Sequence, residues 1–158
     1  MAKLLAIIIL SSLIMVVSSC YSADSHRTRQ FAPQQGDLLF QNSDCGQLCD
    51  AIEAVTSDHQ KANISHVGIA AKDQIGNPVV IEAVSNGVQS TPLKDFLDRS
   101  LDESGNPKVI VGRLKPQYQH LVGSALNNAA KLKGQPYDKV FAIDNGAYYC
   151  SELIYEIF

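Results

Sequence analysis

The sequence predicts an α+β fold, in which an antiparallel β-sheet is packed against helices. Two segments rich in β-branched and small residues, 65–71 and 78–84, flank the turn-forming segment 72–77, and this pattern predicts a β-hairpin. Elsewhere in the chain, apolar residues recur every three or four positions, which predicts amphipathic helices. The sequence contains no internal repeat, so we expect these elements to form one domain, which we place at residues 36–158.

The first 20 residues have the features of an export signal. A short basic segment with Lys3 precedes the apolar run 4–17, which is too short to span a bilayer comfortably. Small residues then lead to Cys20, and Val-Ser-Ser-Cys is similar to a permissive bacterial lipobox. We therefore expect an exported protein of the bacterial cell envelope with Cys20 as its lipidation site. The alternative is an ordinary cleavage nearby, which would leave Cys20 as a free thiol or a disulfide partner.

Composition limits the partners of the chain. The polar segment 21–35 is expected to be a tether. It would hold the domain off the membrane to which the lipid anchor attaches the protein. The whole chain of 158 residues has a formal net charge of −3 and no basic patch. Nucleic acid is therefore not an expected partner, because its recognition requires clustered positive charge.

Five short segments between turn-forming residues are predicted to be strands, and three of them, 65–71, 78–84 and 108–114, contain several β-branched residues. The five segments are residues 36–40, 65–71, 78–84, 87–89 and 108–114.

Three helices are predicted before the final one. Segment 45–56 has apolar residues at helical spacing. The second helix is expected to begin with Thr91 as its N-cap and Pro92 as its first helical residue. Pro116 is expected to begin a longer helix, which Gly134 ends as a C-cap.

Cys150 is the strongest candidate for a functional residue. The turn-forming residues 144–147 precede it and an amphipathic segment follows, so Cys150 is expected in the first turn of the last helix. Free backbone N–H groups and the helix dipole favour an anion there, which stabilises the nucleophilic thiolate. His66 stands at the head of an apolar strand, far away in the sequence. A cysteine with a remote histidine is typical of cysteine-based acyl chemistry.

The predicted hairpin brings a carboxylate to His66. If the turn is centred near Gln74, the numbers of paired residues sum to about 148, and His66 lies directly opposite Glu82. The Cβ atoms of such a pair are roughly 5 Å apart, within reach of an imidazole–carboxylate hydrogen bond. A slip of one residue would instead put the two side chains on opposite faces of the sheet.

These residues predict a catalytic triad. Cys150 would be the nucleophile, His66 the general base and acid, and Glu82 the carboxylate that orients the imidazole. The alternative is that Cys150 is a packed cysteine and His66 a hydrogen-bonded structural residue. Backbone N–H groups at the start of the helix could stabilise an oxyanion. A tyrosine is expected to add one hydrogen bond to the substrate, and the candidates are Tyr149, Tyr137 and Tyr148.

The remaining cysteines do not predict a metal site. Cys45 and Cys49 share one face if their segment is helical, so either they form a disulfide or Cys49 packs as a small apolar residue. A zinc site requires about four ligands, and no second Cys/His pair occurs at the spacing of a zinc finger. We therefore expect neither a metal nor another cofactor.

With these residues identified, the chain resembles the circularly permuted, NlpC-like branch of the papain-fold cysteine peptidases and amidases, the YiiX/YaeF-like family. The resemblance covers nearly all of the chain after residue 35, and the histidine precedes the cysteine, as in the permuted order. The motifs that carry it are, in chain order, Gly36-Asp37-Leu38-Leu39-Phe40, Ser65-His66-Val67-Gly68-Ile69, Ile81-Glu82-Ala83, Tyr137-Asp138 and Tyr149-Cys150-Ser151-Glu152-Leu153.

The resemblance implies a papain-like core and the cleavage of amide bonds by a Cys–His–polar triad. It implies peptidoglycan peptides or lipid amides as substrates without deciding between them. Two alternatives remain open: a thiol acyltransferase that acts on lipid, as in lecithin–retinol-type relatives, and a catalytically inactive binding module of the same fold.

The resemblance also concerns the end of the chain. Domains of this family usually continue past the nucleophile helix, whereas this sequence ends at Phe158. We therefore expect either a truncated chain or missing packing elements, and a poorly buried Cys150 helix.

Overall fold

The computed structural model describes residues 32–43, 46–56 and 63–158. The predicted signal peptide, Cys20, most of the predicted tether and Cys45 lie outside these residues. Within them, no helix has the length and apolar character needed to cross a membrane.

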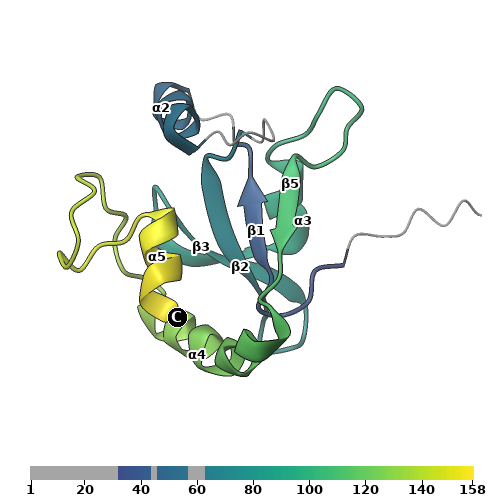
Figure 1. The fold of residues 1–158 in the computed structure, drawn as a ribbon, viewed down its shortest axis with the longest axis vertical. Coiled ribbons are helices and arrows are strands. Elements are labelled where there is room, and N and C mark those ends of the chain that lie inside the picture. The colour runs from purple at the N-terminus through teal and green to yellow at the C-terminus, as the bar shows by residue number, and fades with distance from the viewer. Residues whose placement is uncertain (1–31, 44–45, 57–62) are drawn as a thin grey trace, which may run out of the picture. The chain divides into compact units, whose positions relative to one another are not determined.

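The fold is α+β, with all five predicted strands in one antiparallel sheet of order β4-β3-β2-β1-β5 (Figure 1). The strands are β1 (Leu38–Gln41), β2 (His66–Lys72), β3 (Pro78–Val84), β4 (Gly87–Pro92) and β5 (Val109–Gly112). The helices are α2 (Gln47–Thr56), α3 (Leu93–Asp98), a 3₁₀ helix (Pro116–Leu121), α4 (Val122–Leu132) and α5 (Cys150–Ile157).

Each face of the sheet has its own apolar core, because successive side chains of a strand point to opposite faces. On one face, residues such as Ile69 and Ile81 pack against α4 and α5. On the other face, Ala70 and Val80 pack against α3, whose Phe96 is completely buried. Because helices cover both faces of the sheet, β2 and β3 are apolar almost throughout and do not alternate between apolar and polar residues.

The inner face of helix α5 is completely buried, so the expectation of a poorly buried Cys150 helix is wrong for that face, whereas Tyr155 on the outer face is 80% exposed. Leu153 and Ile157 are 0% and 1% exposed and belong to the same apolar cluster as Ala125 and Ala129 of α4. The small alanine side chains let the two helices approach closely. Burial of each aliphatic side chain contributes about 1.5–3 kcal/mol, which fixes α5 against the sheet.

The register of the hairpin differs by two residues from the prediction. Ile69 pairs with Ile81, and Lys72 pairs with Pro78, so the paired numbers sum to 150 rather than 148. The reason lies in the turn, where the carboxylate of Asp73 accepts the backbone N–H groups of Ile75 and Asn77 and centres the loop one residue later. A shift of two residues keeps every side chain on its predicted face.

His66 and Glu82 are therefore diagonal neighbours rather than directly opposed residues. Continuing the register places Gly68 opposite Glu82. A Cβ atom at Gly68 would lie only 2.5 Å from Cγ1 of Val80 and 3.3 Å from Cβ of Glu82. Position 68 therefore has no room for a side chain against Val80 and Glu82.

We expect Gly68→Ala to destabilise the protein by about 1–3 kcal/mol, because the new methyl group would force Val80 or Glu82 to move. Urea denaturation measures this change in the free energy of unfolding. Gly123→Ala is the matched control, because Gly123 lies in α4 with nothing within 4 Å of the added Cβ and should gain stability from the higher helix propensity of alanine. Equal stability of Gly68→Ala and the unmodified protein would contradict the close approach.

Thr91 does not cap the second helix, contrary to the prediction. Strand β4 continues through Pro92, which is itself the N-cap residue of α3 and makes no side-chain capping bond. The Thr91 hydroxyl donates instead to Oε1 of Glu82, at 2.5 Å. As an N-cap, the Thr91 oxygen would have accepted a backbone N–H group of the helix. Here the hydroxyl instead donates to a buried carboxylate, a strong charge-assisted hydrogen bond.

The predicted long helix is divided. Pro116 begins the 3₁₀ helix, and regular α-helix starts only at Val122. Gly134 follows the end of α4 with φ +90°, the left-handed conformation expected of a glycine that ends a helix.

Candidate active site

Two elements that are distant in the sequence bring the predicted nucleophile and base together. His66 is the first residue of β2, and Cys150 is the first residue of α5. Helix α5 packs on β2 and β3, and the Cys150 thiol is hydrogen-bonded to the His66 ring. The backbone N–H groups of Val67 and Ser151 also donate to the sulfur.

The hydrogen bonds of Cys150 favour its thiolate. Burial alone would raise the pKa of this thiol, but the hydrogen bond to His66, the charge of that ring and the two backbone N–H groups lower the pKa below its usual value. Burial would lower the pKa of His66, but hydrogen bonds to Cys150 and Glu82 outweigh it and raise that pKa to about 9. Both shifts favour the thiolate–imidazolium form of the pair.

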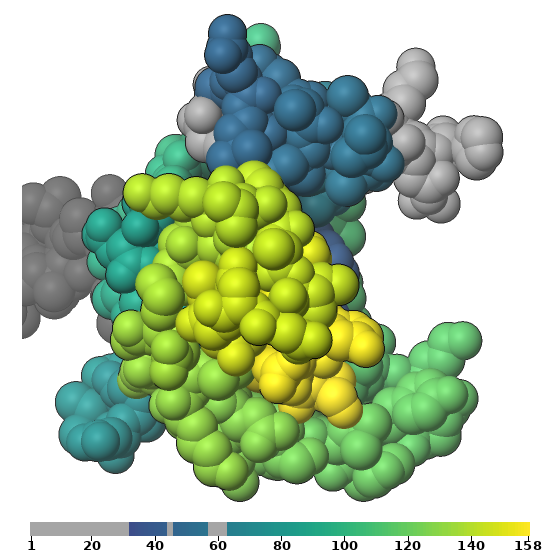
Figure 2. Space-filling model, turned by 90° about the vertical axis from the view of Figure 1, so that its left-hand side faces the viewer, coloured from purple at the N-terminus to yellow at the C-terminus, as the bar shows by residue number. Residues whose placement is uncertain are grey.

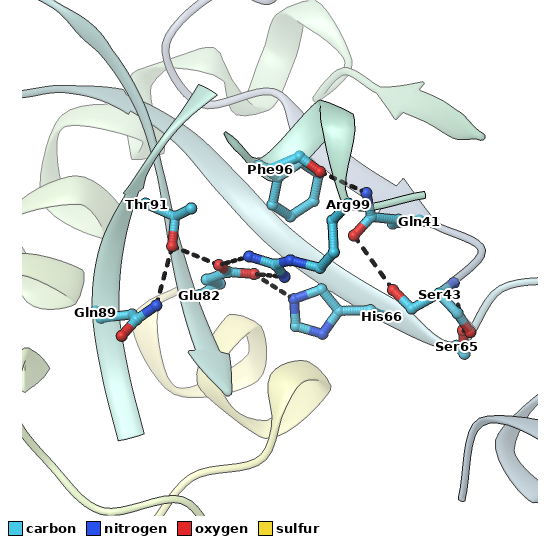
Figure 3. A network of polar contacts seen from close by, with 9 residues as sticks. All are labelled: Gln41, Ser43, Ser65, His66, Glu82, Gln89, Thr91, Phe96 and Arg99. Carbon is cyan, nitrogen blue, oxygen red and sulfur yellow. Dashed lines mark hydrogen bonds and ion pairs between the residues drawn. The ribbon is translucent and has the colours of Figure 1, made fainter. Parts of the chain in front are cut away.

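The Glu82 carboxylate anchors the imidazole. Glu82 is completely buried, and its Oε2 lies 2.6 Å from Nε2 of His66 (Figure 3). This contact leaves Nδ1 of the ring for Cys150. The ring itself lies beside Phe96, with a centroid separation of 6.0 Å. The imidazole is thus held by a carboxylate and lies beside an apolar ring.

Glu82 has two further donors that the sequence analysis did not identify as part of the site. Arg99 donates from Nη1 to Oε2 at 2.9 Å and from Nη2 to Oε1 at 2.7 Å, and the Thr91 hydroxyl donates to Oε1. Burial would raise the pKa of Glu82, but the donors His66 and Arg99 outweigh it and lower the pKa to about 2. Glu82 is therefore ionised throughout the physiological range.

A cavity of about 400 Å³ opens beside Cys150. Apolar side chains and hydroxyl groups form most of its wall, and His66 and Arg99 are its basic side chains. Its lining residues are Ser43, Leu48, Cys49, Ile52, Ser65, His66, Ala83, Val84, Ser85, Arg99, Tyr137 and Cys150.

Of the predicted tyrosines, Tyr137 lies in the site and Tyr149 does not line the cavity. The pKa of Tyr137 is raised by its burial and by the negative charge of Cys150, which places its phenol near the sulfur. The Tyr149 ring instead lies against Phe141, at a centroid separation of 5.3 Å. Both come from the loop between α4 and α5, which lies across the face shown in Figure 2 (yellow-green).

The same loop is held by Asp138, which is 1% exposed. Its carboxylate accepts the backbone N–H groups of Val140 and Ala142, as expected of a residue that caps the loop. This contact orders the segment between Tyr137 and α5.

The described residues contain no group of three or more His, Cys, Asp or Glu side chains placed to hold a metal ion. Among these residues Cys150 has a free thiol, whereas Cys49 takes part in a disulfide. The predicted pairing of Cys49 with Cys45 involves a residue outside the described part of the chain.

Comparison with known proteins identifies relatives over most of the domain. The family model described as "Permuted papain-like amidase enzyme, YaeF/YiiX, C92 family" matches residues 32–158. The YiiX protein of Escherichia coli (strain K12) is 30% identical over 128 residues, which are 80% of this chain and 57% of that protein.

A solved structure is similar as well. The crystal structure described as that of the metalloprotein YiiX from Escherichia coli O157:H7 has a TM-score of 0.61 and 30% sequence identity, covering 80% of this chain and 65% of that chain. This chain thus spans less than two thirds of the length of each of these relatives.

Proposed function

The chain belongs to the permuted papain-like amidase family of YaeF and YiiX, and on that basis we propose that it hydrolyses amide bonds with Cys150 as nucleophile. The observation that carries this proposal is the hydrogen-bonded contact between Cys150 and His66 in the wall of a cavity. A histidine of raised pKa beside a cysteine of lowered pKa is the state that cysteine hydrolases use.

The proposed reaction has two steps. The Cys150 thiolate attacks the carbonyl carbon, and backbone N–H groups at the start of α5, aided by Tyr137, stabilise the oxyanion. His66 then gives its proton to the nitrogen as the C–N bond breaks, which releases an amine and leaves a thioester on Cys150. In the second step His66 takes a proton from water, the hydroxide attacks the thioester, and the acid leaves as the thiolate is restored.

We propose a lipid amide, with an apolar acyl group, as the substrate class. Leu48 and Ile52 of α2 and Val84 of β3 line the cavity next to the nucleophile. Among the lining residues no carboxylate is present to bind the ammonium group of a peptidoglycan stem peptide. An acyl chain packed against these apolar side chains would place its carbonyl at Cys150.

The proposal includes an envelope location. We propose that residues 1–20 direct export and that Cys20 carries a lipid that anchors the domain at the membrane surface. A membrane-anchored enzyme would find an apolar amide in its own bilayer.

The description of the YiiX structure as a metalloprotein is not carried over to this chain. Among the described residues, the candidate metal ligands near the cavity are Cys150, His66 and Glu82. They are hydrogen-bonded to one another in a row and do not converge on one point. The proposed reaction therefore contains no metal-dependent step.

Product analysis tests the proposal. The protein is incubated separately with N-acyl amino acids in detergent micelles and with purified peptidoglycan, and products are identified by mass spectrometry, with Cys150→Ser as the background. We expect release of free fatty acid from the lipid amide, dependent on Cys150. Release of peptidoglycan fragments instead would overturn the substrate class, and no Cys150-dependent product from either substrate would overturn the amidase proposal.

The apolar cavity also supports acyl transfer as a second candidate function. The same thioester could pass its acyl group to a lipid alcohol rather than to water. Adding a long-chain alcohol to the assay separates the two, because a transferase would form an ester at the expense of free acid. An inactive binding module is less well supported, because such a module has no need of an ionised thiol.

A further inference from the structure

Residues at both ends of the short helix α3 donate hydrogen bonds to the Glu82 carboxylate. Thr91 precedes the N-cap residue of α3, and Arg99 is its C-cap residue. Thr91 and Arg99 each donate to Oε1 of Glu82, and Arg99 also donates to Oε2, which His66 shares (Figure 3). Phe96, between them, buries its ring completely and thereby fixes the helix on the sheet.

We propose that Arg99 is a positioning residue, whose two-pronged contact fixes the plane of the Glu82 carboxylate and keeps it ionised so that His66 is held for Cys150. This inference rests on the proposed function and deepens it. Rotation of the carboxylate would break the parallel bonds to Nη1 and Nη2, so the direction of Oε2 toward His66 is set by the guanidinium.

Charge balance points to the same role. Arg99, Glu82, His66 and Cys150 form a row in which neighbouring charges alternate in sign, so the row carries no net charge. Without Arg99 the buried row would carry one uncompensated negative charge. An uncompensated negative charge in a buried row favours the uptake of a proton, and a protonated Glu82 would no longer stabilise the imidazolium.

The groups that face Glu82 come from each neighbouring element. They are His66 on β2, Thr91 on β4 and Arg99 after α3, while Cys150 on α5 acts through His66. Gln89 on β4 pairs with Glu82 across the strands, and its amide donates to the Thr91 hydroxyl. Arg99 is therefore the one permanent cation in direct contact with this carboxylate among the described residues.

The surroundings of Arg99 favour a fixed side chain. Its guanidinium carbon lies 5.4 Å from the centroid of the Phe96 ring, a cation–π contact, and its side chain is 34% exposed. Lysine in this position would keep the charge but could not form the two parallel bonds. Charge and geometry can thus be separated by substitution.

The chain also offers a matched control. Arg113 forms the same kind of contact with another buried carboxylate, donating from Nε and Nη2 to the two oxygens of Asp37 at 2.7 Å each. Neither Arg113 nor Asp37 lines the catalytic cavity. Arg113→Gln therefore breaks an equivalent ion pair without touching the site.

The test is the pH dependence of carboxamidomethylation at Cys150, followed by mass spectrometry of its peptide in Arg99→Gln, Arg99→Lys, Thr91→Val and Arg113→Gln. In Arg99→Gln we expect the acid limb of the profile of rate against pH to move to higher pH by about one unit. This shift is a tenfold loss of rate on that limb. Arg99→Lys should restore the limb, Thr91→Val should move it slightly in the same direction, and Arg113→Gln should leave it in place.

An unmoved acid limb in Arg99→Gln, or an equal shift in Arg113→Gln, would overturn the inference. If Arg99→Gln does not fold, the comparison of Thr91→Val with Arg99→Lys decides. The acid limb of Thr91→Val must lie at higher pH than that of Arg99→Lys, and identical profiles would reject the role of Arg99. The measurement uses no amide substrate, so a failed amidase assay would leave this result standing. Loss of stability alone would not move the limb.

Discussion

Cys150→Ser and His66→Ala will each lower the rate of amide hydrolysis by roughly a thousandfold or more. The serine hydroxyl cannot be ionised by an imidazole to the extent that a thiol is, so the first variant loses its nucleophile. The second loses both the charge that stabilises the thiolate and the proton that the leaving amine requires. Because the two residues act as a unit, the double variant should be no slower than either single one.

The control for this pair is His120→Ala. His120 is an exposed histidine in the last turn of the 3₁₀ helix and is not among the residues that line the cavity. Its removal should leave the steady-state rate within a factor of two. A His66→Ala protein that retained more than a tenth of the activity would contradict the role of His66 as base and acid.

Glu82→Gln will lower both activity and stability. The amide cannot balance the charges of His66 and Arg99, and breaking a buried ion pair by removing one partner costs about 3 kcal/mol. The pKa of His66, now about 9, should fall because its hydrogen-bonded carboxylate is gone. The alkaline limb of the rate profile should therefore move to lower pH, together with an overall loss of ten- to a hundredfold.

Two measurements check this prediction, namely urea denaturation and the pH profile of hydrolysis. Asp37→Asn is the matched control, because it removes a carboxylate from the other buried arginine pair. Asp37→Asn should lose stability, but the alkaline limb of its rate profile should stay at the same pH. An unchanged limb in Glu82→Gln would show that the carboxylate does not govern His66.

Glu82 also predicts how stability depends on pH. Its pKa is lowered from 4.5 to about 2 on folding, so its contribution is fully present above about pH 4.5 and is lost as the pH falls toward 2. Glu82→Gln should therefore show a weaker loss of stability over this interval than the unmodified protein.

The order of elements and the positions of Cys150 and His66 at the start of α5 and β2 could be predicted from the sequence, because their signals are local. A cysteine after a turn and before an amphipathic segment marks the start of α5, and β-branched runs mark the strands. The predicted register was two residues off, yet it kept His66 and Glu82 on one face because side chains alternate with a period of two.

Other features depend on contacts that sequence spacing does not reveal. Thr91 precedes a proline at the start of a helix, as an N-cap residue does, but its hydroxyl donates a hydrogen bond to the buried carboxylate of Glu82. Arg99 belongs to no motif and becomes part of the site only when α3 is folded onto the sheet. The one available signal was Glu82 itself, a carboxylate in an apolar strand that required more donors than a single histidine could supply. The burial of α5 likewise depends on alanines of another helix.

The most direct test of the central claim is the ultraviolet absorbance of the Cys150 thiolate as a function of pH, taken as the difference between the unmodified protein and Cys150→Ser. An ion pair with His66 predicts thiolate absorbance at neutral pH and below, and its loss from that range in His66→Ala. A thiol that titrates near pH 8.5, in the same way with and without His66, would contradict the claim.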